Sequence, residues 1–168
     1  IHGEPGSGKS RLMFDFVASK GEYALVEPRP GDEAVIYSTQ ARTVRRFLEK
    51  FPDEVLEPWV RTELSRLVPD ISTESPPPMQ SETDKLRLFE ATAWLTLKHH
   101  ALGANAVVMD DVQFADAGSL EIGNFLVSKY AFTLDTLRSV NAYRTGEISP
   151  QMDMTIQNLV NAGTAVLI

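Results

Sequence analysis

Residues 3–10 decide the fold, and they read Gly-Glu-Pro-Gly-Ser-Gly-Lys-Ser. They match the pattern G-x-x-x-x-G-K-[ST] in full. Glycines allow a backbone turn in which successive N–H groups point inward toward an anion. An apolar periodic segment that starts at Lys9 predicts a helix directly after the loop, and its positive N-terminal end favours the same anion. The stretch therefore predicts a phosphate-binding loop.

The chemistry of this loop suits a nucleoside triphosphate. Lys9 would place its ammonium group against the β- and γ-phosphates of ATP, and the Ser10 hydroxyl would bind Mg²⁺. A glycine-rich turn with a surface lysine is the alternative interpretation. The candidate nucleotide-binding residues are the whole loop and the residue after it: Gly3, Glu4, Pro5, Gly6, Ser7, Gly8, Lys9, Ser10 and Arg11.

The composition is that of a single globular domain. The chain has 168 residues, of which 43% are hydrophobic and 23% charged, so it can bury one core without disulfides. It contains no cysteine, which excludes thiolate metal sites and suits the cytoplasm. The net charge of −7 disfavours direct nucleic-acid binding, and no apolar run is long enough for a membrane helix.

Helical and strand patterns alternate along the chain. The apolar spacing predicts helices at 9–19, 42–50, 58–68, 81–102, 116–130 and 151–162, and strands at 34–37, 106–109, 137–143 and 164–168. A proline run makes 72–80 an internal loop. Strands separated by helices predict a three-layer α/β domain with a parallel sheet. Because the chain starts inside a strand, we expect residues 1–168 to be one ATPase core domain cut from a longer protein, without a C-terminal lid.

Two carboxylates follow the strand expected at 106–109. Asp110 at the tip of a buried strand can hold Mg²⁺, usually through the water shell of the ion, and Asp111 can orient or deprotonate an attacking water. Taken alone, an Asp pair after a strand is more often a turn or a helix cap. The phosphate loop about 100 residues upstream favours the functional interpretation. We expect Asp116 to cap the next helix.

A cationic side chain ends the strand expected at 137–143. Strand ends in parallel sheets face the ligand crevice, so Arg144 could contact the γ-phosphate; the alternative is a surface arginine. A second group of cations, Arg42, Arg45, Arg46 and Lys50, shares one side of a helix, and we interpret it as a solvated face.

With these residues identified, the chain resembles the ATPase module of bacterial STAND-type regulators, within the AAA+-like (Orc1-like) P-loop ATPases. The resemblance covers most of the chain, and the combination of DDVQFADAGSLE at 110–121 with NAYRTGE at 141–147 is its narrowest part. It implies that Gly3 to Ser10 bind ATP, that Asp110 and Asp111 handle Mg²⁺ and water, and that Arg144 senses the γ-phosphate. Typical AAA+ enzymes carry Asp-Glu where this chain has Asp-Asp.

These observations together predict a slowly hydrolysing Mg-ATP switch, with Lys9, Asp111 and Arg144 as catalytic residues and Ser10 and Asp110 as metal ligands. The resemblance implies fused effector and sensor domains, a signalling or transcriptional role and nucleotide-dependent self-association. A small-molecule or nucleoside kinase is a rival enzyme, because it shares the loop. A nucleotide-binding scaffold without turnover is the rival outside the enzymes.

Overall fold

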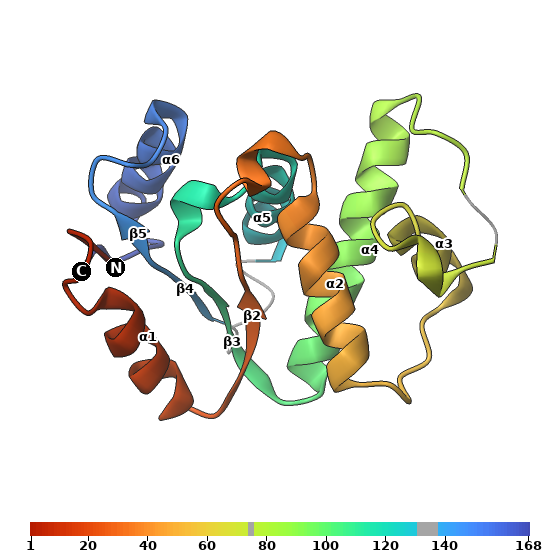
Figure 1. Ribbon diagram of the computed structural model, residues 1–168, viewed down its shortest axis with the longest axis horizontal. Coiled ribbons are helices and arrows are strands. Elements are labelled where there is room, and N and C mark those ends of the chain that lie inside the picture. Colours follow the sequence, from red (N-terminus) through yellow and green to blue (C-terminus); the bar gives the residue numbers. More distant parts are fainter. Residues whose placement is uncertain (74–75, 131–137) are drawn as a thin grey trace.

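The computed structural model describes residues 1–73, 76–130 and 138–168 (Figure 1). The strands are β1 (His2–Gly3), β2 (Glu22–Val26), β3 (Ala104–Met109), β4 (Arg138–Asn141) and β5 (Tyr143–Arg144). The helices are α1 (Lys9–Ala18), α2 (Ser38–Lys50), α3 (Pro58–Leu64), α4 (Glu82–Ala101), α5 (Ala117–Tyr130) and α6 (Pro150–Asn161). Short 3₁₀ turns are η1 (Asp32–Ala34), η2 (Pro69–Ile71) and η3 (Val112–Phe114).

All strand pairs are parallel. β3 lies between β2 and β4, and β5 pairs with β1. Ala142 joins the two sets, because its N–H donates to Met109 O at 2.8 Å and the next N–H, of Tyr143, donates to Ile1 O at 3.1 Å. The segment formed by β4 and β5 therefore lies between β3 and β1. The carboxyl ends of β1, β5 and β3 meet at one edge.

Helices cover both faces of the sheet. On one face, Met13 and Val17 of α1 pack in one apolar cluster with Val108 of β3. On the other, Val107 lines a small cavity together with side chains of α2 and α4. The alternating side chains of β3 thus contact different helices, as period-2 geometry requires. The prediction of an α/β domain with a parallel sheet is confirmed at this level.

A second core lies away from α1, where α2, α3 and α4 pack together (Figure 1). Phe47, Val60 and Leu64 are at most 2% exposed there. Ser81 begins α4 with a capping box, in which Asp84 N–H donates to Ser81 Oγ and Ser81 N–H donates to the Asp84 carboxylate. Among the helices that the structure describes, none is long and apolar enough to cross a membrane.

The prediction of a strand at 34–37 is wrong. Ala34 ends η1, and Tyr37 adopts a left-handed backbone conformation (φ 64°) before α2 begins. Val35 and Ile36 are 59% and 67% exposed, so this run is not a buried strand. The strand in this part of the sheet is β2, which the sequence analysis did not identify.

The strand expected at 164–168 is also not formed as a regular element. The termini nevertheless lie side by side next to β5 (Figure 1), where His2 N–H donates to Ile168 O at 2.8 Å. The strand expected at 137–143 is present as β4 and β5, although Leu137 lies outside the described residues. Helix α2 begins four residues earlier than expected and α3 ends four earlier, whereas α1, α4, α5 and α6 lie within one residue of their predicted bounds.

Candidate functional site

The loop from Gly3 to Lys9 connects β1 to α1 and curls around the lysine side chain. Gly6 and Gly8 have φ values of 77° and 87°, a left-handed conformation that side chains rarely adopt. Lys9 Nζ donates hydrogen bonds to the carbonyl oxygens of Gly3 and Glu4, both at 2.8 Å. The lysine is therefore drawn back over the loop that precedes it, and the sequence analysis did not predict these two bonds.

The N-terminus of α1 follows directly. No side chain caps it at Gly8, and the hydroxyl of Ser10 has no hydrogen-bond partner in the described part of the chain. Free N–H groups at a helix start, next to an ammonium group, form an electropositive concavity. Arg11 points to a different partner: its Nε lies 3.5 Å from Asp15, and its side chain is 88% exposed.

Strand pairing brings the predicted arginine next to the loop. Arg144 is in register with Gly3, and Thr145 N–H donates to Gly3 O at 3.3 Å. One strand further along the sheet, Asp110 and Asp111 follow the end of β3. The loop, the arginine and the carboxylate pair therefore share one edge of the sheet, although about 100 residues or more separate the loop from the other two in the sequence.

Asp111 and Arg144 contact each other directly. Arg144 Nε lies 3.3 Å from Asp111 Oδ1, and the two side chains are 32% and 38% exposed. The guanidinium also lies 3.4 Å from Glu147 and stacks over the Phe114 ring at 5.3 Å. Asp111 has φ 50°, and its N–H donates to Asp110 Oδ1 at 3.0 Å. The sequence placed both residues at strand ends but did not predict this ion pair.

Gln113 is the site residue that the sequence analysis missed. Its Nε2 donates to Asp111 Oδ1 at 2.7 Å, and its Oε1 accepts the backbone N–H of Arg144 at 3.2 Å. It thus joins the ends of β3 and β5. A glutamine two residues after a carboxylate gives no signal by itself, because its second partner is set by strand pairing.

The structure confirms that Asp116 caps the helix that follows it, and it shows a second role for this residue. Its carboxylate accepts the Ser119 N–H at 2.9 Å at the start of α5. The same carboxylate accepts the N–H groups of Tyr37 and Thr39 at 2.6 and 3.1 Å, and so closes the start of α2 as well. Asp116 is 1% exposed. It holds two helices together near the strand ends.

The four cations on α2 mostly pair with carboxylates. Arg42 binds Asp32 at 2.7 Å, Arg46 binds Glu27 at 2.9 Å and Lys50 binds Glu22 at 2.7 Å, whereas Arg45 makes no ion pair to any described residue. The hydrogen bonds from Arg42 hold the pKa of Asp32 well below its usual range. This face is therefore largely neutralised by the chain itself.

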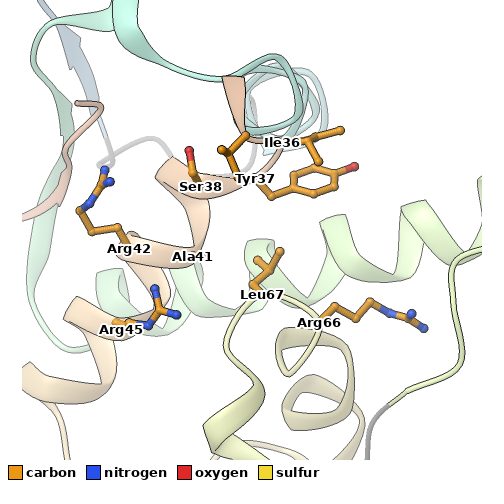
Figure 2. A pocket seen from close by; sticks show the side chains of 9 residues that line it. Ile36, Tyr37, Ser38, Ala41, Arg42, Arg45, Arg66 and Leu67 are labelled. Atoms are coloured by element: carbon orange, nitrogen blue, oxygen red, sulfur yellow. The ribbon is translucent and has the colours of Figure 1, made fainter. Parts of the chain in front are cut away.

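Figure 2 shows a cavity whose lining includes no residue of the strand-end site. It has a volume of about 460 Å³ and lies between the start of α2 and the residues after α3. Its lining residues are Val35, Ile36, Tyr37, Ser38, Ala41, Arg42, Arg45, Arg66 and Leu67. None of them is a residue that the sequence predicted to bind nucleotide. Within the described residues, no group of three or more His, Asp or Glu side chains is arranged to hold a metal ion.

Comparison with known proteins gives no match: no protein-family model fits the sequence, and no curated protein or solved structure is significantly similar to the chain.

Proposed function

We propose that this chain is a Mg-ATP-binding switch ATPase of the P-loop type, resembling the STAND-type and AAA+-like modules. It would act as a regulatory domain in a larger cytoplasmic protein. Binding and slow hydrolysis of ATP would shift the equilibrium between two arrangements of fused effector and sensor domains, or between separate and self-associated copies.

One observation carries the proposal: three candidate elements meet at the same edge of a parallel sheet. The loop at the end of β1 presents Lys9 and the uncapped start of α1, and Arg144 is in register with Gly3 of that loop. The carboxylate pair follows β3. Parallel α/β sheets bind ligands at the carboxyl ends of their strands, so the common edge of these three groups supports a triphosphate site there.

Each residue has a distinct role in this proposal. The loop N–H groups and Lys9 bind the phosphates, and Arg144 contacts the γ-phosphate. Ser10 and Asp110 would hold a magnesium ion: both offer oxygen ligands, the Ser10 hydroxyl has no partner among the described residues, and Asp110 Oδ1 accepts only a backbone N–H. When bound, the ion would neutralise phosphate charge. Asp111 would orient the attacking water.

A second candidate is a scaffold that binds nucleotide without turnover. The ion pair between Arg144 and Asp111 favours it, because the guanidinium engages the carboxylate that hydrolysis requires. For hydrolysis to occur, the Arg144 guanidinium must leave Asp111 and contact the phosphate instead. Release of phosphate from Mg-ATP in a single-turnover assay of the full-length protein separates the two candidates, and the scaffold releases none. Transfer of that phosphate to a small molecule would instead indicate a kinase.

Lys9→Ala tests the binding site. The substitution removes a charge-assisted phosphate contact, and we expect at least a tenfold loss of ATP affinity by calorimetry with the full-length protein. Lys20→Ala, just after the same helix, is the matched control and should bind ATP as the parent does. Equal ATP affinity in the Lys9 variant and the parent would contradict the assignment of the loop.

A further inference from the structure

Gln113 is fixed by two hydrogen bonds of opposite polarity. The Arg144 backbone N–H can donate only to the amide oxygen, Oε1, at 3.2 Å. That bond turns Nε2 toward Asp111, where it donates to Oδ1 at 2.7 Å. The two partners therefore determine the orientation of the amide.

The two oxygens of Asp111 have different surroundings. Oδ1 accepts from Gln113 Nε2 and lies 3.3 Å from Arg144 Nε. Oδ2 has no hydrogen-bond partner in the part of the chain that the structure describes. One oxygen is thus anchored, and the other is left to accept a proton or a hydrogen bond from water.

The two anchors respond differently when Arg144 moves. Its guanidinium leaves Asp111 if it turns to a phosphate. The bond from Gln113 does not depend on that side chain, because Gln113 is held by the Arg144 main chain in β5. β5 is in turn fixed by its pairing with β1. Gln113 is then the partner that keeps Asp111 in place.

We infer that Gln113 is a positioning residue for ATP hydrolysis, which holds Asp111 by one oxygen while Arg144 binds the γ-phosphate. This inference rests on the proposed function. In the step it serves, a water oxygen bonds to the γ-phosphorus while a water proton passes to Asp111 Oδ2. The bond from the γ-phosphorus to the bridging oxygen breaks, its electron pair stays on ADP, and inorganic phosphate leaves.

Two substitutions at Gln113 separate positioning from a structural role. Gln113→Met removes both hydrogen bonds at similar length, and we expect kcat for ATP to fall at least tenfold while KM changes less than threefold. Gln113→Glu still accepts the Arg144 N–H but places a carboxylate beside Asp111. Because that carboxylate cannot donate to Asp111, we again expect kcat to fall at least tenfold while KM changes less than threefold.

Gln157 on the exposed side of α6 supplies the matched controls, Gln157→Met and Gln157→Glu, which should leave both readouts unchanged. All assays use the full-length protein. If Gln113→Met does not fold, kcat and KM of Gln113→Glu decide the question. Gln113 variants that match the Gln157 controls, in a protein that hydrolyses ATP, overturn this inference alone. A parent protein that binds ATP but releases no phosphate overturns the inference together with the hydrolytic part of the proposed function.

Discussion

The strand-end site and the helical part of the molecule treat their helix N-termini in opposite ways. Side-chain oxygens close the starts of α2, α4, α5 and α6: Asp116 serves α2 and α5, Ser81 serves α4 and Ser149 serves α6. The start of α1 has no side-chain cap and follows a loop of left-handed glycines. In the helical part, side chains accept these N–H groups at α2 and α4, and the uncapped α3 begins with Pro58, which has no N–H; the loop at 3–8 leaves the N–H groups of α1 without a side-chain acceptor among the described residues.

The side chains of the two regions also differ in how deeply they are buried. Val60 and Leu64 in the helical core are completely buried, whereas the side chains of Asp111 and Arg144 are about one third exposed. Apolar burial stabilises a fold, and partly exposed charges contribute little to it. Substitutions at the helix junctions should therefore reduce stability, and substitutions at the strand ends should change nucleotide affinity.

The largest effect is expected from Asp116→Ala. The change leaves the buried N–H groups of Tyr37, Thr39 and Ser119 without their acceptor. Each unsatisfied buried donor costs about 1–3 kcal/mol, so the free energy of unfolding should fall by about 3–5 kcal/mol. Urea denaturation measures it, with the exposed Asp53→Ala as control. A loss below about 1 kcal/mol would mean that these helix starts find other partners.

The same junction explains which parts of the fold the sequence could predict. Helix α4 was predicted correctly because the spacing of its apolar residues is a local feature of the sequence. The run 34–37 looked like a buried strand, but Tyr37 N–H binds a carboxylate 79 residues away, and its ring packs where a Cβ on Gly118 would lie 2.5 Å from it. A partner so far away in the sequence does not affect the local spacing of apolar residues.

At the candidate site, local sequence motifs predicted which residues lie at strand ends but not which residues contact each other. The phosphate loop, Asp110, Asp111 and Arg144 were placed at strand ends from their own neighbours in the sequence. The ion pair of Asp111 with Arg144 and the bridge through Gln113 depend on the order β3, β4–β5, β1, which brings two distant strand ends together. Residues with long-range partners were therefore the ones that the sequence could not reveal.

A smaller effect, confined to nucleotide binding, is expected from Arg144→Ala. A guanidinium that reaches the γ-phosphate contacts ATP and not ADP, so the variant should lose about 1–3 kcal/mol more binding energy for ATP than for ADP. Stability should change little, because the pair with Asp111 is partly exposed. Paired ATP and ADP titrations of the full-length protein measure the difference, with the exposed Arg29→Ala as control. Equal losses for the two nucleotides would show that Arg144 does not report the γ-phosphate.

The smallest expected effect is a change of stability with pH that arises in the helical part of the molecule. His99 packs edge-on against Phe47 and Phe51, and its Nε2 is buried without a hydrogen-bond partner among the described residues. Burial, with a lesser contribution from the positive charge of Lys50, lowers the pKa of His99 to about 4, while Glu22 opposes the shift. Folding thus favours the neutral ring, and stability should be complete above the unfolded pKa of about 6.5 and decline as the pH falls toward 4.

Since the His99 ring is only partly buried, we expect the free energy of unfolding to fall by an amount on the order of 1 kcal/mol between pH 7 and pH 5. Urea denaturation at the two pH values should show that His99→Phe reduces this loss and that the exposed His2→Gln does not; the same loss in all three proteins would assign the pH dependence to other groups.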